Sequence, residues 1–361
     1  MTAPGRLAQT LLWLCETPSL TGQEGPLCDA LLARVEQQPL AAPVRRFGNS
    51  LVVPVSRGTG GPAVALAGHL DVVPSVHDGP PRIDGDRLYG PGASDMKSGL
   101  ALMVDLLETE PELCGGVDLT LVFYAREEGD FDDNELGVVL REDPELAEVE
   151  LAVCLEPSDN KLSLGACGSL QAGLLFSGRA AHSARPWQGD NAIHRAGELL
   201  CELAALEPQR VVLDGLTYAT VTVATLAEGG RSRNIVPDRF VLNVNHRFAP
   251  NQGVAEAKRD LERWVDGRAE IEWRDACPGA LPRGDHRLIA ALQEAGVEAV
   301  EPKQAWTDVA HFALHGVAAV NFGPGVAAQA HQRNEFTSLT KLERGRTILA
   351  RWLRAIGAAA S

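Results

Sequence analysis

Long apolar segments are missing from this chain of 361 residues. No run of about 18 or more apolar residues occurs, so we expect no membrane-spanning helix. The opening MTAPGRLAQT has no basic stretch followed by an apolar stretch and a cleavage site, so we expect no secretory leader. The seven cysteines include no Cys-x-x-Cys pair. An odd, unpatterned set is typical of reduced thiols, which predicts a cytoplasmic protein without a disulfide framework.

Three common catalytic motifs are missing as well. The lack of Gly-x-Ser-x-Gly disfavours a serine hydrolase. The lack of His-Glu-x-x-His excludes a one-metal protease built on that helix. Glycines do surround Asp95, but Met96 stands where a phosphate loop needs glycine directly before Lys97.

Basic residues are outnumbered, with 33 Lys and Arg against 48 Asp and Glu and a net charge of -15. An acidic surface repels phosphate groups, so we expect no nucleic acid partner. An anionic substrate would need a local basic pocket.

The apolar residues that are present predict an α/β fold. The chain is long enough for two domains, and 45% hydrophobic with 22% charged residues is ordinary for a globular protein. Short apolar runs predict buried strands at 63–68, 118–125 and 151–155, and helical spacing predicts a helix over 98–108. Strands that alternate with helices imply a mostly parallel sheet.

The middle of the chain has a different pattern. From 169 onward the stretches read strand, helix, strand, strand, helix, strand, with the first helix over 191–206. This order resembles a small ferredoxin-like α+β domain. Helix and strand signals resume after a proline- and glycine-rich stretch. We therefore expect one domain split between 1–168 and 282–361, with a second domain, 169–281, inserted into it.

Carboxylates and histidines stand where the predicted strands end, which is where open α/β sheets bind ligands. At the three predicted strand ends they are His69-Leu-Asp71, Glu127-Glu128 and Glu156-Pro157. Two further candidates come from glycine-rich loops: Asp95 within Tyr89–Gly99, which opens a helix, and His331 after Asn321–Gly325. A carboxylate such as Asp71 can orient a histidine ligand. Adjacent Glu127 and Glu128 point to different sides of an extended backbone, so one can bind metal while the other faces the substrate water.

Each motif alone also has an ordinary structural explanation. His69 could be a satisfied surface histidine, Asp95 a helix cap, and the acidic pair a solvated surface feature. Together, however, they supply what two zinc ions sharing a carboxylate require. The expected roles are His69 and Glu156 on one ion, Glu128 and His331 on the other, Asp95 as the bridge, and Glu127 as the general base.

These motifs, in this order, resemble the zinc aminoacylase and carboxypeptidase superfamily over nearly the whole chain. The resemblance implies a mixed-sheet di-zinc hydrolase domain and an inserted domain that serves as lid and dimerisation surface. It thus implies two Zn²⁺ per subunit, with Co²⁺ as a substitute, and a homodimer formed through the insert. It also implies a cis peptide bond after Asp95.

Further segments are similar to the succinyl-diaminopimelate desuccinylases of that superfamily. They are Arg179–His194, Asn234–Asp238, Asn245–Pro250, Trp306–Val309 and Asn321–Gly325. The similarity implies that His182 reaches the active site of the partner subunit and polarises the scissile carbonyl. It also implies substrate contacts from Asn234, Arg247 and Gly323. The substrate expected from it is N-succinyl-LL-2,6-diaminopimelate, a small N-acyl amino acid.

One segment departs from that pattern. Gly165–Ser169 contains no arginine where some relatives carry one, so recognition of the succinyl end is expected to differ. Acetylornithine deacetylase, or another deacylase or dipeptidase of the superfamily, is therefore an alternative. A non-catalytic binding protein on the same scaffold is a third, but the complete ligand set and Glu127 argue against it.

Overall fold

The computed structural model describes residues 5–110 and 115–359, and the chain divides into two compact units. The first unit comprises Met1–Leu164, Arg283–Glu301 and His311–Ser361, and the inserted unit comprises Gly165–Pro282 and Pro302–Ala310. From the sequence we expected the boundaries at 168/169 and 281/282. The structure instead groups residues 302–310 with the inserted unit, where the backbone N–H of Cys167 donates to the Lys303 carbonyl at 3.3 Å.

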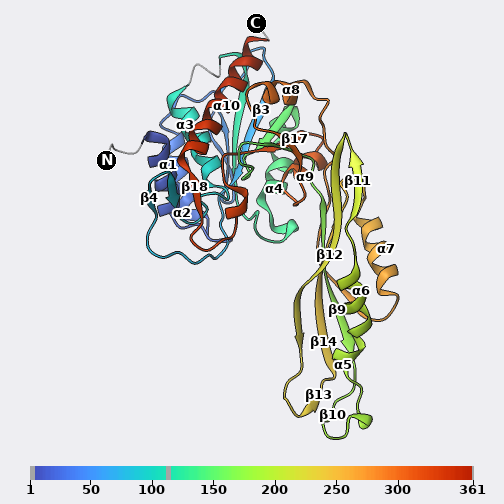
Figure 1. Cartoon of the computed structure of the whole chain (residues 1–361). Coiled ribbons are helices and arrows are strands. Elements are labelled where there is room, and N and C mark those ends of the chain that lie inside the picture. The colour runs from blue at the N-terminus through green and yellow to red at the C-terminus, as the bar shows by residue number, and fades with distance from the viewer. Residues whose placement is uncertain (1–4, 111–114, 360–361) are drawn as a thin grey trace. The chain divides into compact units, whose positions relative to one another are not determined.

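An eight-stranded mixed sheet organises the first unit (Figure 1). Its spatial order is β1 (Arg45–Phe47), β2 (Ser50–Pro54), β6 (Asp118–Tyr124), β3 (Ala63–His69), β7 (Leu151–Cys154), β17 (Ala318–Phe322), β8 (Leu162–Leu164) and β16 (Val300–Pro302). The neighbours β6, β3, β7 and β17 run parallel, whereas β2 is antiparallel to β6 and β8 is antiparallel to β17. The strands expected at 63–68, 118–125 and 151–155 are thus confirmed as β3, β6 and β7.

The four parallel strands are almost wholly buried, which explains why their sequences read as continuous apolar runs. Helices α1, α3 and α10 pack against one another, and α3 packs on β3. Gly68 allows this close approach, because a Cβ there would lie 2.7 Å from a Leu100 methyl carbon. The helices are α1 (Arg6–Glu16), α2 (Gly25–Val35), α3 (Lys97–Thr109), α4 (Glu135–Glu142), α8 (Arg287–Glu294), α9 (Val309–Leu314) and α10 (Leu339–Ala358).

A small antiparallel sheet joins distant parts of the first unit. It consists of β18 (Phe336–Ser338), β5 (Arg87–Tyr89) and β4 (Arg82–Asp84). Residues shortly before Asp95 therefore pair with residues shortly after His331.

No helix among the described residues is long and apolar enough to cross a membrane.

The inserted unit is an antiparallel sheet with helices. Its strand order is β11 (Gln209–Leu213), β12 (Leu216–Gly229), β14 (Arg239–Phe248), β9 (Gly168–Ser177) and β15 (Glu270–Cys277). Helices α5 (Ala192–Arg195), α6 (Gly197–Ala205) and α7 (Val254–Val265) connect these strands, and β10 (Ala181–His182) pairs with β13 (Ile235–Val236). The order β12-β14-β9-β15 is that of two interleaved βαβ units, as in ferredoxin-like domains.

Candidate metal centre

His69 is the last residue of the central strand β3 and is almost fully buried. Its ring Nδ1 lies 3.0 Å from the backbone oxygen of Asp71, and its Nε2 lies 3.3 Å from Oδ1 of Asp95. Burial alone would lower the pKa of His69, but the contacts with Asp71 and Asp95 outweigh it and raise the pKa well above its usual value, so a metal ion must displace a proton from Nε2. Once that proton is lost, the hydrogen bond from Nδ1–H to the Asp71 carbonyl leaves the Nε2 lone pair directed toward the carboxylates. This is the tautomer that a metal-binding histidine needs.

The Asp71 carboxylate holds the next strand end in place. Its two oxygens accept hydrogen bonds from the backbone N–H groups of Glu127 and Glu128, each at 3.0 Å. Burial alone would raise the pKa of Asp71, but the contacts with His69 and with these N–H groups outweigh it and hold the pKa below its usual value. Asp71 therefore orients residues of two neighbouring strands, His69 through its backbone oxygen and Glu127 and Glu128 through its carboxylate.

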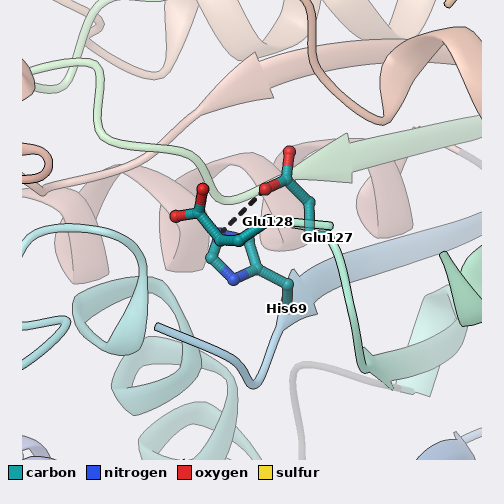
Figure 2. Close-up of side chains that lie close together, drawn as sticks. All are labelled: His69, Glu127 and Glu128. Atoms are coloured by element: carbon teal, nitrogen blue, oxygen red, sulfur yellow. Dashed lines mark ion pairs between the residues drawn. The ribbon is translucent and has the colours of Figure 1, made fainter. Parts of the chain in front are cut away.

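Glu127 and Glu128 follow β6, and their side chains diverge. Arg126, just before them, has a left-handed backbone with φ of 65°. Oε2 of Glu127 lies 3.9 Å from Nε2 of His69, whereas Oε1 of Glu128 lies 2.9 Å from Nε2 of His331. Figure 2 shows the two carboxylates on different sides of the His69 ring. The side chains diverge as expected, but not because the backbone is extended: Glu127 and Glu128 lie in a turn in which the Gly129 N–H donates to the Arg126 carbonyl at 3.4 Å.

Asp95 lies between the two histidines. Its Oδ1 is 3.3 Å from Nε2 of His69, and its Oδ2 is 3.5 Å from Nε2 of His331. One oxygen toward each histidine is the arrangement that a bridging carboxylate requires. The Asp95–Met96 peptide bond is cis, which confirms the cis peptide bond that the resemblance implies after Asp95.

Five of the predicted residues form two overlapping groups. The ligand atoms of His69, Asp95 and Glu156 all lie within 4.8 Å of one another, and so do those of Asp95, Glu128 and His331. These groups match the division between two ions that the sequence predicted, with Asp95 common to both. Glu127 also lies within this distance of His69 and Glu128.

The donor set fits a pair of divalent cations. Three carboxylates and two imidazoles, each offering an oxygen or nitrogen, are the ligands that zinc, cobalt and manganese accept. Carboxylates gathered this closely repel one another, and cations between them would remove that repulsion. The residues present therefore fit two metal ions.

His331 completes the second group from the C-terminal part of the chain. It has a left-handed backbone, with φ of 61°, and a side chain that is 51% exposed. The hydrogen bond to Glu128 raises the pKa of His331 to about 9. The metal-free chain therefore holds an imidazolium–carboxylate pair here, and a metal ion must displace that proton to bind.

Sequence reasoning missed two residues beside this centre. The buried Glu335 carboxylate accepts hydrogen bonds from the backbone N–H groups of Ser94 and Asp95, and burial raises its pKa to about 7. The buried Lys97 ammonium donates to the Leu14 and Thr17 carbonyls at 3.0 Å each. Neither residue follows an apolar strand, the signal that identified His69, Glu128 and Glu156.

Gly323 has a place in packing. A Cβ at this position would lie 2.4 Å from the Glu156 carbonyl oxygen. Its N–H donates to Oγ of Ser158 at 2.9 Å, and its carbonyl accepts from the Asn160 N–H at 2.9 Å. Because its backbone groups are already engaged, the geometry favours a packing role for Gly323 over the substrate contact that the resemblance implies.

The remaining predicted residues lie in the inserted unit, at opposite ends of its sheet. His182 and Asn234 are exposed neighbours at the β10–β13 pair, where the Ser183 N–H donates to the Asn234 carbonyl at 2.9 Å. Arg247 lies near the other end of β14, and its Nε donates to Oδ1 of Asn245 at 3.0 Å. Eight residues of extended strand separate the two ends, about 27 Å.

Comparison with known proteins identifies the family of this chain. The model of peptidase family M20/M25/M40 matches residues 65–355, which include all five residues of the two groups. The chain belongs to this family. Among solved structures, this M20 chain is similar to a tripeptidase from Staphylococcus aureus, with a TM-score of 0.79 and 20% identity over 98% of both chains. It is also similar to a dinuclear metal binding peptidase of the M20 family from Bacillus subtilis, with a TM-score of 0.72 and 15% identity over 98% of both chains.

Curated relatives match over nearly the full length of this M20 chain. A putative succinyl-diaminopimelate desuccinylase from Mycobacterium tuberculosis is 38% identical over 94% of this chain and 96% of its own. A succinyl-diaminopimelate desuccinylase from Corynebacterium glutamicum is 36% identical over 94% of both chains. The fold is therefore that of the M20 peptidases, with a candidate metal cluster at the carboxyl ends of its central strands.

Proposed function

We propose that this M20 chain hydrolyses the amide bond of N-succinyl-LL-2,6-diaminopimelate, releasing succinate and LL-diaminopimelate. The observation that carries the proposal is the pair of ligand groups sharing Asp95, with Glu127 beside them. The two curated relatives support the choice of acyl group and amine.

The proposed cofactor is a pair of Zn²⁺ ions per subunit, for which Co²⁺ can substitute. His69, Asp95 and Glu156 would hold one ion, and Asp95, Glu128 and His331 the other. Such ions supply Lewis acidity toward a water molecule and toward the amide carbonyl. The number of ions is tested by metal analysis of purified protein and by titration of Zn²⁺ into protein whose metal has been removed by a chelator. A stoichiometry of one ion per subunit would contradict the bridging role of Asp95.

Glu127 is the general base in this proposal. Its carboxylate lies beside His69, while Asp71 fixes its backbone. It takes a proton from the attacking water and then delivers that proton to the nitrogen of the departing amine. Glu127→Ala should lower kcat by about 10²–10⁴ while the protein still binds two metal ions. Equal loss of metal would identify Glu127 as a ligand instead.

Substrate preference decides between the desuccinylase and its alternatives. We expect the Zn²⁺-loaded enzyme to cleave N-succinyl-LL-diaminopimelate with a kcat/KM at least 100-fold above that for N-acetylornithine, since a discrimination of this size is what paired polar groups provide. Arg247 is the cation proposed to pair with a substrate carboxylate. A preference for acetyl over succinyl substrates would replace the proposal with an acetylornithine-type deacylase.

We infer that the chain is a homodimer formed through the inserted unit. Among the described residues, no strand pairs with the outer edge of β12 beyond Thr220, although its other edge pairs with β14 as far as Gly229. Val223 and Leu226 on this stretch are 48% and 52% exposed. A long open edge with apolar side chains is a template for pairing, and two copies can pair isologously about a two-fold axis.

Charge on that edge tests the dimer. The double change Val223→Lys and Leu226→Lys should convert a dimer into a monomer, as measured by light scattering after gel filtration. Val212→Lys is the matched control, because Val212 is an equally apolar, 65% exposed residue on the neighbouring strand β11. A wild-type monomer, or a dimer that survives the double change, would contradict the inference.

A dimer would let His182 act in the partner's site, where it is proposed to polarise the scissile carbonyl. In a purified heterodimer of His182→Ala and Glu127→Ala chains, one site keeps its own Glu127 and receives His182 from the other chain. About half of wild-type activity is then expected, although each parental homodimer is inactive. Inactive heterodimers would show that His182 does not act across subunits.

We also place the enzyme in the cytoplasm, since its seven cysteines are spaced like reduced thiols.

A further inference from the structure

Glu335 connects the two segments that supply Asp95 and His331. Its Oε1 accepts hydrogen bonds from the backbone N–H groups of Ser94 and Asp95, at 2.7 and 2.8 Å. Its Oε2 accepts from the N–H of Gly92 at 3.1 Å. The residue is only 3% exposed. A single buried side chain thus binds the backbone of Asp95 itself and lies four positions after His331.

Other contacts fasten the His331 segment on both sides of the ligand. Oγ of Ser94 donates to the Phe336 carbonyl at 2.8 Å and accepts from the Val326 N–H at 3.0 Å. The Asn334 side chain exchanges two hydrogen bonds of 2.7 Å with Asp78. Because the segment is held before and after His331, the position of this histidine depends on the loop that carries Asp95.

The chemistry of the contact requires a carboxylate. Three convergent N–H donors need an acceptor-only group, and an ionised carboxyl offers two oxygens with about four acceptor positions. A glutamine would turn its amide N–H₂ toward one of those donors and leave that donor unpaired. Glutamine is therefore close in shape to Glu335 but cannot satisfy all three N–H groups.

We propose that Glu335 is a positioning residue of the metal centre, which holds Asp95 and His331 in register so that their shared site is preformed for a divalent cation. The inference rests on the metal centre proposed above. Groups that orient metal ligands typically change metal affinity 10–100-fold when they are altered. The Asp95–Glu128–His331 site should be affected most, because both of its outer segments meet at Glu335.

The test compares Glu335→Gln with Asp86→Asn in the full-length protein. Asp86 is the matched control, because its carboxylate also joins the N-terminal half to the C-terminal segment, accepting from the Thr340 N–H at 2.9 Å and from Oγ of Ser338 at 2.6 Å. It touches no ligand loop. Zn²⁺ affinities are measured by chelator competition and calorimetry, and the melting temperature of each metal-free protein is measured alongside.

We expect Glu335→Gln to weaken binding of one Zn²⁺ ion by about 10–100-fold and Asp86→Asn to leave both affinities within about threefold, even where both variants melt at a lower temperature. In a His331→Ala background, which lacks the more affected site, Glu335→Gln should weaken the remaining ion by less than it weakens the ion held by His331, because Asp95 is then the only ligand that Glu335 contacts. This comparison separates positioning of one site from general loss of structure.

Equal Zn²⁺ affinities in Glu335→Gln and wild type, or equal losses in both variants, would overturn the inference and leave the metal centre standing. Absence of Zn²⁺ binding by wild type would instead overturn the metal centre, and this inference with it. If Glu335→Gln does not fold, Glu335→Asp replaces it, since the shorter side chain keeps the charge but withdraws the carboxylate from the three N–H groups. A selective loss for one ion supports the proposal, and unchanged affinities contradict it.

Discussion

The substitution Asp71→Asn tests how the centre is built. The Asp71 carboxylate accepts from the N–H groups of Glu127 and Glu128, both at 3.0 Å, and asparagine keeps only one acceptor oxygen. One N–H therefore loses its partner, and a hydrogen bond to a charged group contributes roughly 1.5–3 kcal/mol. If this loss appears as misplacement of the general base or the ligand, kcat/KM falls by about 10–100-fold, since about 1.4 kcal/mol corresponds to a factor of ten.

The assay is steady-state hydrolysis of the succinylated substrate with Zn²⁺ in excess, with the free energy of unfolding measured by urea titration. Asp118→Asn is the matched control. Asp118 begins the same strand, β6, and accepts from the consecutive N–H groups of Gly58 and Thr59 at 3.1 and 2.9 Å. Both variants should lose similar stability, but only Asp71→Asn should lose activity. Activities within about threefold of each other would refute the anchoring role of Asp71.

Three further outcomes are expected. Gly323→Ala should destabilise the fold by about 1–3 kcal/mol in urea titration, because its Cβ would overlap the Glu156 carbonyl. Glu108→Gln should lower the free energy of unfolding by about 1 kcal/mol near neutral pH. Hydrogen bonds from Arg34 and Arg6 outweigh burial and hold the pKa of Glu108 below its usual 4.5. Because the folded pKa is depressed, the difference from wild type in urea titrations should shrink below about pH 4.5. Removal of metal by chelation should lower Tm, and Zn²⁺ at 100 times its Kd should restore about 2.7 kcal/mol, whereas an unchanged Tm would contradict a metal that binds only the folded chain.

The positions of three predicted ligands were accessible from sequence because they follow apolar strands. His69 ends β3, Glu128 follows β6 and Glu156 follows β7, so the pattern alone places them at one edge of the sheet. In a parallel sheet the carboxyl ends of all the strands lie at the same edge. The division of the ligands into two groups with Asp95 in common followed from counting donors.

Glu335 could not be found in the same way. It lies in the polar stretch Gln332–Glu335, which reads as solvated surface, yet the side chain is 3% exposed. It is buried because the backbone turns through left-handed conformations at His331 and Asn334, with φ of 61° and 53°. The composition of the stretch gives no sign of these turns.

Local irregularities account for most other differences. One helix was expected over 191–206, but the chain forms α5 and α6, separated at Ala196 next to Gly197. The strand β11 was missed because its five residues are partly or fully exposed and lack a buried face. Residues 302–310 join the inserted unit through contacts such as that of Gln304 with the Ala219 N–H at 3.0 Å, which no local pattern encodes.

The location of β17 has a consequence for biosynthesis. This strand fits between β7 and β8, although more than 150 residues of chain separate it from either. While the chain emerges from the ribosome, β7 therefore lacks its neighbour β17. The inserted antiparallel sheet already has all its own strands, so it can fold before β17 is synthesised. His331 follows β17, so the paired cation site closes only after translation is nearly finished. A ribosome-bound fragment that ends before His331 should consequently have no hydrolase activity.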